Sequence, residues 1–296
     1  MSISLCMLTR NEEAFVEQAL NSVKGLVDEI IIVDDNSSDK TVEIAKKFTD
    51  KVFSRSLDNN FAEARNFTLQ KATKDWILIL DADEVISSKD HSTIKELIQD
   101  SNYVAYSLMQ ASYTNDSSQF SFTPITNPSK ESKGFKGYIS CNIIRLFKNH
   151  QNIKFANPVH ESVDASIQDK NKIKKTNLFI HHYQFEKQDQ KEKQLRYLKI
   201  YEEKIDLFTN KAKVYRDMGI IYSSFKQEYE KAITCFKKSL EFNENNIKTY
   251  VGLVMCYTKL KQFKEALNIL EIAGKKFQNN QEIAKIKQAV HYLQSL

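Results

Sequence analysis

Two carboxylates separated by one residue follow an unbroken apolar run. The run is residues 77–80, and Asp81 and Asp83 come directly after it. Four consecutive apolar residues are typical of a strand buried on both faces, as in a parallel sheet. The carboxylates would then lie at the carboxyl end of that strand, where open α/β sheets bind ligands. Because two adjacent acids need a positive partner, the pattern predicts a divalent cation that also binds phosphates.

A second strand of the same kind occurs earlier in the chain. Residues 30–33 are all apolar, and Asp34 and Asp35 follow them. Two such strands within the first 85 residues indicate an enzyme that handles a metal-bound nucleotide. The sequence has no G-x-x-x-x-G-K-[ST] loop, no G-x-G-x-x-G fingerprint and no G-x-S-x-G elbow. Kinase, dinucleotide oxidoreductase and serine hydrolase functions are therefore unsupported.

The elements that would position these acids alternate between strands and helices. Strands are predicted at residues 2–8, 29–33, 51–53 and 76–80, and helices at 11–24, 42–48, 60–71 and 86–100. This alternation predicts an α/β fold with a doubly wound, mostly parallel sheet. Further strands are predicted at 141–147 and 178–183. The polar stretch 114–136 lacks any period and is predicted to be a long loop.

After Lys187 the sequence becomes repetitive. Six positions recur, namely Tyr215, Met218, Gly219, Tyr222, Ala232 and Phe236, as Tyr250, Leu253, Val254, Tyr257, Ala266 and Leu270. The first four pairs are 35 residues apart and the last two 34, so the first copy carries one extra residue near Lys226. This period resembles the tetratricopeptide repeat, a pair of antiparallel helices. With flanking helices at 190–208 and 281–294, we expect an all-α solenoid over residues 188–296 and a separate domain over 1–187.

Composition narrows the choice of partners and compartment. The chain has 296 residues and a net charge of +5, but its basic residues are spread along helices that also carry acids. No nucleic-acid partner is therefore expected. The longest apolar run is far shorter than a membrane span, so no transmembrane segment is expected either. Four cysteines, Cys6, Cys141, Cys235 and Cys256, are predicted to be buried free thiols in a reducing cytoplasm.

Seven short motifs, in this order, resemble family 2 glycosyltransferases with the GT-A fold. They read LTRNEE (8–13), VDDNSSD (33–39), FAEARN (61–66), LDADE (80–84), RLF (145–147), PVHE (158–161) and HY (182–183). The last three resemble a subgroup with C-terminal tetratricopeptide repeats. The resemblance implies a metal-dependent, inverting transfer of sugar from a nucleoside diphosphate sugar, with a UDP-sugar favoured, to a glycan or peptide acceptor. It also implies a cytoplasmic enzyme, peripheral at the inner face of the membrane.

The resemblance assigns donor-site roles to individual residues. Asp83 is expected to bind a Mn²⁺ or Mg²⁺ ion on the donor diphosphate, with Asp81 nearer the ribose or a metal-bound water. Asp35 is expected to accept a hydrogen bond from a uracil-type base, with Asp34 supporting it. Arg65 would contact the base, ribose or diphosphate with its planar fork. The other nucleotide-sugar candidates are Thr9, Asn11, Glu12 and Ala82.

The later motifs supply the expected chemistry at the acceptor. An inverting transfer needs a base that takes the proton of the acceptor, and Glu161 is our candidate, with His160 as the alternative. A structural hydrogen-bonding pair in the turn after Pro158 is the other interpretation of these two residues. His182 is a candidate second metal ligand, or else a histidine whose ring bonds the backbone of a strand.

Other interpretations of the same residues stay open. Asp34 and Asp35 could form a helix-capping turn, and Arg65 could be a surface charge. A nucleotidyltransferase shares the sheet and the acids, but it would carry a glycine-rich basic loop where this chain has Thr-Arg-Asn-Glu, residues 9–12. A scaffold with an inactive first domain is the third possibility. The repeats are expected to present an acceptor or to pair two copies of the chain.

Overall fold

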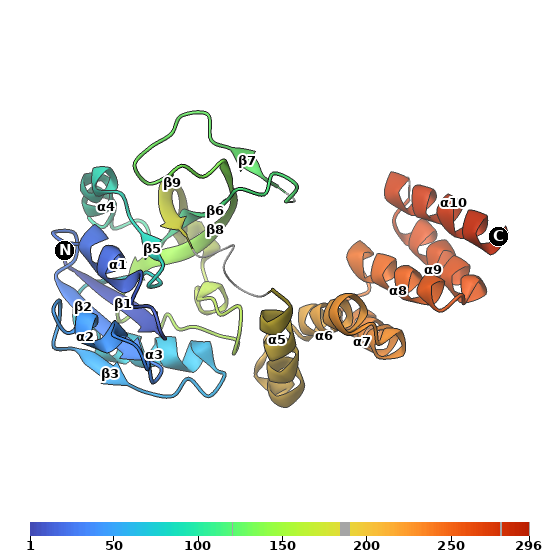
Figure 1. The fold of residues 1–296 in the computed structure, drawn as a ribbon, viewed down its shortest axis with the longest axis horizontal. Coiled ribbons are helices and arrows are strands. Elements are labelled where there is room, and N and C mark those ends of the chain that lie inside the picture. Colours follow the sequence, from blue (N-terminus) through green and yellow to red (C-terminus); the bar gives the residue numbers. More distant parts are fainter. Residues whose placement is uncertain (120, 184–189, 279, 296) are drawn as a thin grey trace. The chain divides into compact units, whose positions relative to one another are not determined.

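The computed structural model describes residues 1–119, 121–183, 190–278 and 280–295. The chain divides into two compact units, Met1–Gln188 and Asp189–Leu296 (Figure 1). The first unit is built from strands and helices and the second from helices alone, which confirms the predicted fold class. The predicted domain boundary, between Lys187 and Gln188, lies outside the described residues.

The N-terminal half of the sheet is parallel. It contains β1 (Ile3–Thr9), β2 (Glu29–Asp34), β3 (Val52–Ser54) and β4 (Trp76–Ile79), in the spatial order β3-β2-β1-β4. Alternate residues of each central strand enter two different cores. Leu5 and Met7 of β1 lie in one core, whereas Cys6 lies in the other. Burial on both faces explains why these strands are unbroken apolar runs.

Helices cover both faces of this half-sheet (Figure 1). One face packs against α1 (Val16–Ser22), α2 (Thr41–Ala45) and α4 (His91–Leu97), and the other against α3 (Phe61–Lys71). The chain leaves β1 towards β2 on one side and returns to β4 on the other. The carboxyl end of β1 is therefore a topological switch point, the position at which such sheets usually form a ligand-binding crevice. Thr9, Asp34 and Asp81 come from the strand ends that border it.

The second half of the sheet is mixed. In spatial order it contains β8 (Gly137–Lys148), β6 (Ala105–Thr114), β9 (Ile173–His182) and β5 (Glu84–Val85). β8 is antiparallel to both β4 and β6, β9 is parallel to β6, and β5 is antiparallel to β9. Single helical turns lie at η1 (Ser88–Asp90), η2 (Asp164–Ser166) and η3 (Lys170–Lys172). The helix predicted over 86–100 is thus shortened to η1 and α4.

The described residues between β6 and β8 form turns and loops, as predicted for the segment 114–136, with one short strand among them. This strand, β7 (Thr123–Pro124), pairs with the start of β8. Further along, the hydroxyl of Tyr183 donates to the backbone oxygen of Glu131 over 2.9 Å, and the ammonium of Lys133 lies 3.7 Å from the centre of the Tyr183 ring. The segment shows no hydrophobic periodicity because it is held by these separate contacts and not by one continuous apolar face.

The helical unit is a stack of consecutive helix pairs. Its helices are α5 (Gln190–Lys204), α6 (Lys211–Ile221), α7 (Tyr229–Phe242), α8 (Ile247–Lys259), α9 (Phe263–Lys276) and α10 (Gln281–Ser295), with single turns at η4 (Ile205–Leu207) and η5 (Tyr222–Lys226). From α6 to α10, each helix contacts the next along the chain. The η5 turn is π-helical and ends at Gln227, whose φ is 57°. Because a π turn holds one residue more than an α turn, it accommodates the predicted insertion.

One buried ring joins three helices of this stack. Phe236 of α7 is fully buried between Gly219 of α6 and Gly252 of α8. A Cβ atom on Gly219 would lie 2.7 Å from the ring of Phe236, and one on Gly252 would lie 2.6 Å from it. The absence of a side chain at these two positions therefore sets the spacing of the helices.

We expect Gly219→Ala to lower the free energy of unfolding of the helical unit by about 1–3 kcal/mol, the usual cost of overpacking a core. Gly274→Ala is the matched control, because a Cβ on Gly274 of α9 meets nothing within 4 Å. That substitution should stabilise the unit by up to about 1 kcal/mol through helix propensity. Chemical denaturation followed by far-ultraviolet circular dichroism measures both, and equal effects would contradict the packing argument.

Candidate active site

Asp34 supports the turn that follows β2. Its carboxylate accepts hydrogen bonds from Oγ1 of Thr9 at 2.8 Å and from the backbone N–H and hydroxyl of Ser37 at 2.8 and 2.6 Å. The side chain is buried. These contacts are the ones expected if Asp34 forms a capping turn. They are also the ones expected if Asp34 supports Asp35.

The loop after β1 is tied to this turn. Asn11, in left-handed backbone conformation with φ 54°, donates its N–H to Oγ of Ser37 and accepts from the N–H of Ser38, both at 2.8 Å. The N–H of Glu12 donates to the hydroxyl of Thr41 at 2.7 Å. These contacts hold residues 9–12 and 35–39 as one rim of the crevice. Donor contacts by Thr9, Asn11 and Glu12 stay a prediction.

Asp35 lies on the same rim and is buried. Its two oxygens accept from the N–H of Leu57 at 3.0 Å and from Nη1 of Arg10 at 2.8 Å. The Arg10 side chain is 63% exposed, so this ion pair can rearrange at little cost. A base-binding role for Asp35 stays a prediction.

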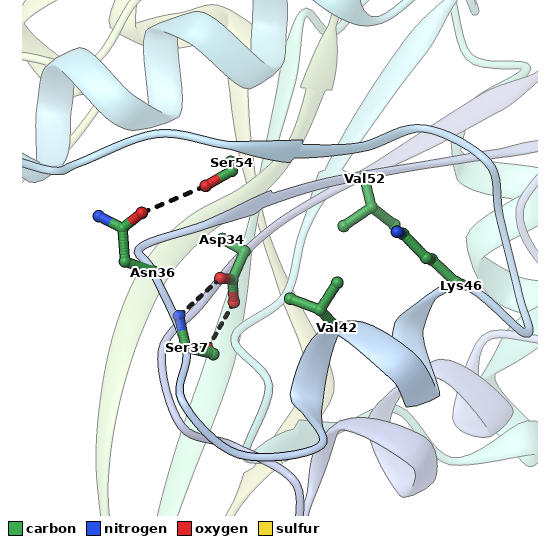
Figure 2. A pocket seen from close by; sticks show the side chains of 7 residues that line it. All are labelled: Asp34, Asn36, Ser37, Val42, Lys46, Val52 and Ser54. Atoms are coloured by element: carbon green, nitrogen blue, oxygen red, sulfur yellow. Dashed lines mark hydrogen bonds between the residues drawn. The ribbon is translucent and has the colours of Figure 1, made fainter.

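A pocket of about 370 Å³ lies beside the end of β2 (Figure 2). Its lining residues are Asp34, Asn36, Ser37, Val42, Lys46, Val52 and Ser54. Figure 2 shows the polar side chains of Asn36, Ser37 and Ser54 on one side and those of Val42, Lys46 and Val52 on the other. Of the predicted site residues, only Asp34 lines this pocket.

Arg65 of α3 joins two of the predicted site residues. Its Nη2 lies 2.7 Å from Oδ1 of Asp81, and its Nε lies 2.8 Å from Oε1 of Glu161. Burial alone would lower the pKa of Arg65, but the two carboxylates outweigh it and raise the pKa. Only 7% of the side chain is exposed, so the alternative of a surface charge is wrong. Contact of Arg65 with the donor stays a prediction.

Asp81 lies between two guanidinium groups. Its Oδ2 accepts from Nη2 of Arg145 at 2.8 Å, and the same nitrogen lies 3.1 Å from Oε1 of Glu84. Burial alone would raise the pKa of Asp81, but Arg145 and Arg65 hold it well below its ordinary range. Glu84 is fully buried, and this burial raises its pKa despite Arg145. Glu84 also accepts from the backbone N–H of Asp81 at 2.8 Å.

Asp83 and His182 are brought together although 99 residues separate them. Strand β5 pairs antiparallel with β9, with Glu84 opposite His182, and Oδ2 of Asp83 lies 2.9 Å from Nε2 of His182. The other ring nitrogen lies 2.9 Å from the hydroxyl of Ser112 on β6. Burial alone would lower the pKa of His182, but Asp83 and the nearby acids raise it.

Asp83 and His182 could hold a divalent ion that also binds substrate. Among the described residues, no group of three or more His, Cys, Asp or Glu side chains could enclose a metal ion by itself. Mg²⁺ and similar ions in nucleotide enzymes take one or two protein ligands and complete their shell with phosphate oxygens and water. Asp83 and His182 would supply that number of ligands, with the ion in place of the proton that the nearby acids favour on the His182 ring.

Glu161 reaches the site from the turn that contains the PVHE motif. A bridge between Ala156 and Ser162 closes this turn, and the N–H of Phe61 donates to the carbonyl of Pro158 at 2.8 Å. Glu161 is mostly buried against Arg65, whereas His160 is exposed with φ 52°. The structure therefore connects Glu161 to Asp81 through Arg65. Ala82 is buried in the core.

Sequence reasoning missed three contributors to this arrangement. Arg145 and Glu84 belong to recognised motifs but received no role, and Ser112 belongs to none. An arginine within a strand that is otherwise apolar, as in IIRLF (residues 143–147), was the available signal, because such a charge is rarely buried without a partner. Cys141 corrects another prediction. It is exposed, because it lies in the stretch 140–142 of β8, where all three residues are exposed, and it pairs with Gln110.

Comparison with known proteins agrees with the class that the fold and the acids indicate. The sequence profile of Glycosyl transferase family 2 matches residues 4–153, half of the chain, and that of the Tetratricopeptide repeat matches 226–290. The chain is 32% identical over 165 residues to a TPR repeat-containing protein of Synechococcus elongatus, covering 56% of this chain and 36% of that protein. It is 31% identical over 169 residues to an uncharacterized glycosyltransferase of Rickettsia typhi, covering 56% and 52%.

A solved structure shares the fold. The crystal structure of S. aureus TarS 1-349 aligns with all of this chain and 92% of its own, with a TM-score of 0.53 at 14% identity. The chain belongs to glycosyl transferase family 2, and this confirms the predicted enzyme class and the predicted C-terminal repeats. The match spans about a third to a half of the two curated relatives. None of the helices that the structure describes is long and apolar enough to cross a membrane.

Proposed function

We propose that this chain is a metal-dependent, inverting glycosyltransferase that moves a sugar from a nucleoside diphosphate sugar to a glycan or peptide acceptor. The observation that carries the proposal is the pairing of Asp83 with His182 at the carboxyl edge of the sheet. A Mn²⁺ or Mg²⁺ ion held there would neutralise the charge that gathers on the leaving diphosphate.

The residues around this pair have distinct tasks in the proposed reaction. Asp83 and His182 would hold the ion that binds the diphosphate. Asp81, paired with two arginines, lies on the ribose side. Glu161 takes the proton from the acceptor hydroxyl on the opposite side of the sugar. Its Oε1 accepts from Arg65, and among the described residues no group donates to its Oε2, which leaves that atom able to accept the proton.

A UDP-sugar is the favoured donor. Support comes from the S. aureus TarS 1-349 fold, also solved in complex with UDP, which aligns with this chain at a TM-score of 0.51 and 14% identity. Asp35 would accept from the N–H of a uracil-type base. The motivating observation in this chain is that its partner Arg10 is exposed and can move aside. A cytoplasmic location is proposed from the free cysteines, three of which are buried.

Thermal-shift measurements test the donor class. The protein is heated with a panel of UDP-, GDP- and dTDP-sugars, each with Mn²⁺, with Mg²⁺ or with chelator. Because a ligand that binds only the folded state stabilises it by about 2.7 kcal/mol at 100 times its Kd, a UDP-sugar with metal should raise Tm by several degrees. No shift with any nucleotide sugar would contradict the proposal, as would a larger shift with a nucleoside triphosphate, which favours a nucleotidyltransferase.

The helical unit has a proposed role of its own. We assign to it the presentation of the acceptor or the pairing of two copies of the chain. The unit has a continuous packed interior, including Phe236, Leu253 and Leu270. Each candidate donor residue belongs to the first unit, so the repeats are not required to build the donor site.

A further inference from the structure

Five side chains of alternating charge form one continuous chain through the site. In spatial order they are Glu84, Arg145, Asp81, Arg65 and Glu161. The successive nitrogen–oxygen distances are 3.1, 2.8, 2.7 and 2.8 Å. The first residue is fully buried, and the last is the base of the proposed reaction. This row of ion pairs therefore connects the interior of the sheet to the acceptor side of the crevice.

Asp81 is the central member and is held from both sides. Its Oδ1 accepts from Arg65 and its Oδ2 from Arg145. Because each oxygen has its own guanidinium, the carboxylate cannot rotate without breaking an ion pair. Asp81 in turn supplies one of the two anchors of Arg65, and Glu161 is the other. The orientation of Glu161 thus depends on Arg65, and that of Arg65 depends on Asp81.

Arg145 begins this sequence of contacts from a bulge in β8. Its neighbours Leu146 and Ile144 pair with Tyr106 and Ser107 of β6, and the register shift between these two pairs falls at Arg145. Only 11% of its side chain is exposed. A single atom, Nη2, makes both contacts, to Asp81 and to Glu84. Arg65 differs, since it uses Nε for Glu161 and Nη2 for Asp81. A side chain with one cationic nitrogen can therefore make both contacts of Arg145. The two contacts of Arg65 need two nitrogens.

We propose that Arg145 is a positioning residue for sugar transfer. It fixes Asp81, which holds Arg65 in the orientation that places Glu161. Arg145 itself need not touch either substrate. The inference rests on the proposed function through the role of Glu161 as base, so its test includes a measurement that is independent of any donor.

The single substitution Arg145→Met cannot separate a loss of positioning from a loss of stability. Arg145→Met leaves Glu84 buried without a cation, and breaking a buried ion pair can prevent folding. The informative variant is the double substitution Arg145→Met with Glu84→Gln, which removes both charges together. Glu84→Gln alone is its matched reference, because there Arg145 still holds Asp81. Arg145→Lys is the conservative variant that keeps one cationic nitrogen.

The first measurement is the NMR signal of the Arg65 Nε–H, which donates to Glu161. It is recorded on ¹⁵N-labelled protein and assigned by its loss in Arg65→Lys. The signal should stay sharp in Glu84→Gln and Arg145→Lys, and shift or broaden in the double variant. An unchanged signal in the double variant overturns the proposal, whatever the donor is.

The second measurement is transfer from the UDP-sugar that gives the largest thermal shift with Mn²⁺. Relative to Glu84→Gln, the double variant should lose about 10²-fold in kcat, the scale for a misplacement of about 1 Å. Arg145→Lys should recover most of the loss. A kcat equal to that of Glu84→Gln overturns the proposal. If the wild-type protein transfers no sugar, the proposed function fails, while the Arg65 signal still decides whether Arg145 positions Arg65.

Discussion

Replacing Asp83 by Asn should lower the rate of sugar transfer by about 10²-fold or more, the scale for removing one electrostatic stabiliser. Asn has nearly the same shape, so its amide can keep the contact of 2.9 Å with His182. The charge is what disappears. Without it, a divalent ion loses one of its two proposed protein ligands and binds the donor diphosphate less well. Initial rates at saturating donor, measured over a Mn²⁺ titration, show the effect.

Asp206→Asn is the matched control for this substitution. Asp206 is an exposed carboxylate of the helical unit that pairs with Lys211 at 2.8 Å, so its loss should leave the rate unchanged. Unchanged transfer by Asp83→Asn would refute the metal role of Asp83. So would full wild-type activity in an excess of chelator.

Glu161→Gln should abolish measurable transfer and leave the affinity for the donor within about threefold of wild type. The amide oxygen can still accept from Nε of Arg65, so the local structure is kept. What is lost is the ability to take a proton, which acts on kcat and not on ground-state binding. Calorimetry with UDP and Mn²⁺ measures the affinity, and product formation measures the rate.

His160→Asn is the comparison that separates the two candidate bases. Asn tolerates the left-handed backbone conformation of His160, with φ 52°, so the turn should survive. If this variant is inactive and Glu161→Gln is active, then His160 is the base. If Glu161→Gln loses donor binding together with transfer, Glu161 has a binding or structural role instead.

Local patterns in the sequence were sufficient for the parallel half of the sheet and for the repeats. Residues 77–80 and 30–33 are apolar because β4 and β2 are buried on both faces, and the acids follow because those strands end at the crevice. The extra residue near Lys226 could be located because it changes the spacing between equivalent positions, and the π turn at Tyr222–Lys226 accommodates it.

Pairings across long distances could not be derived in this way. Strand β5 has only two residues, Glu84 and Val85, too few for any periodicity, yet it determines which residue lies beside Asp83. The ion pairs of Arg65 depend on Asp81 and Glu161, and Glu161 is 96 residues further along the chain. A local pattern indicates that a charge is present, but it cannot indicate which opposite charge will be buried against it. The resemblance to a family supplied His182 as a candidate, and it gave Arg145 no role.

The position of β9 has a consequence for the order of folding. β9 carries His182 and is the last strand along the chain among the described residues of the first unit. It pairs with β5, which lies about 97 residues earlier. Pairing over so long a loop costs closure entropy, so contacts of this kind form slowly compared with local ones. During synthesis, Asp83 is translated long before His182. We therefore expect the metal-binding pair to be among the last features of the first unit to form, after the parallel half of the sheet has assembled.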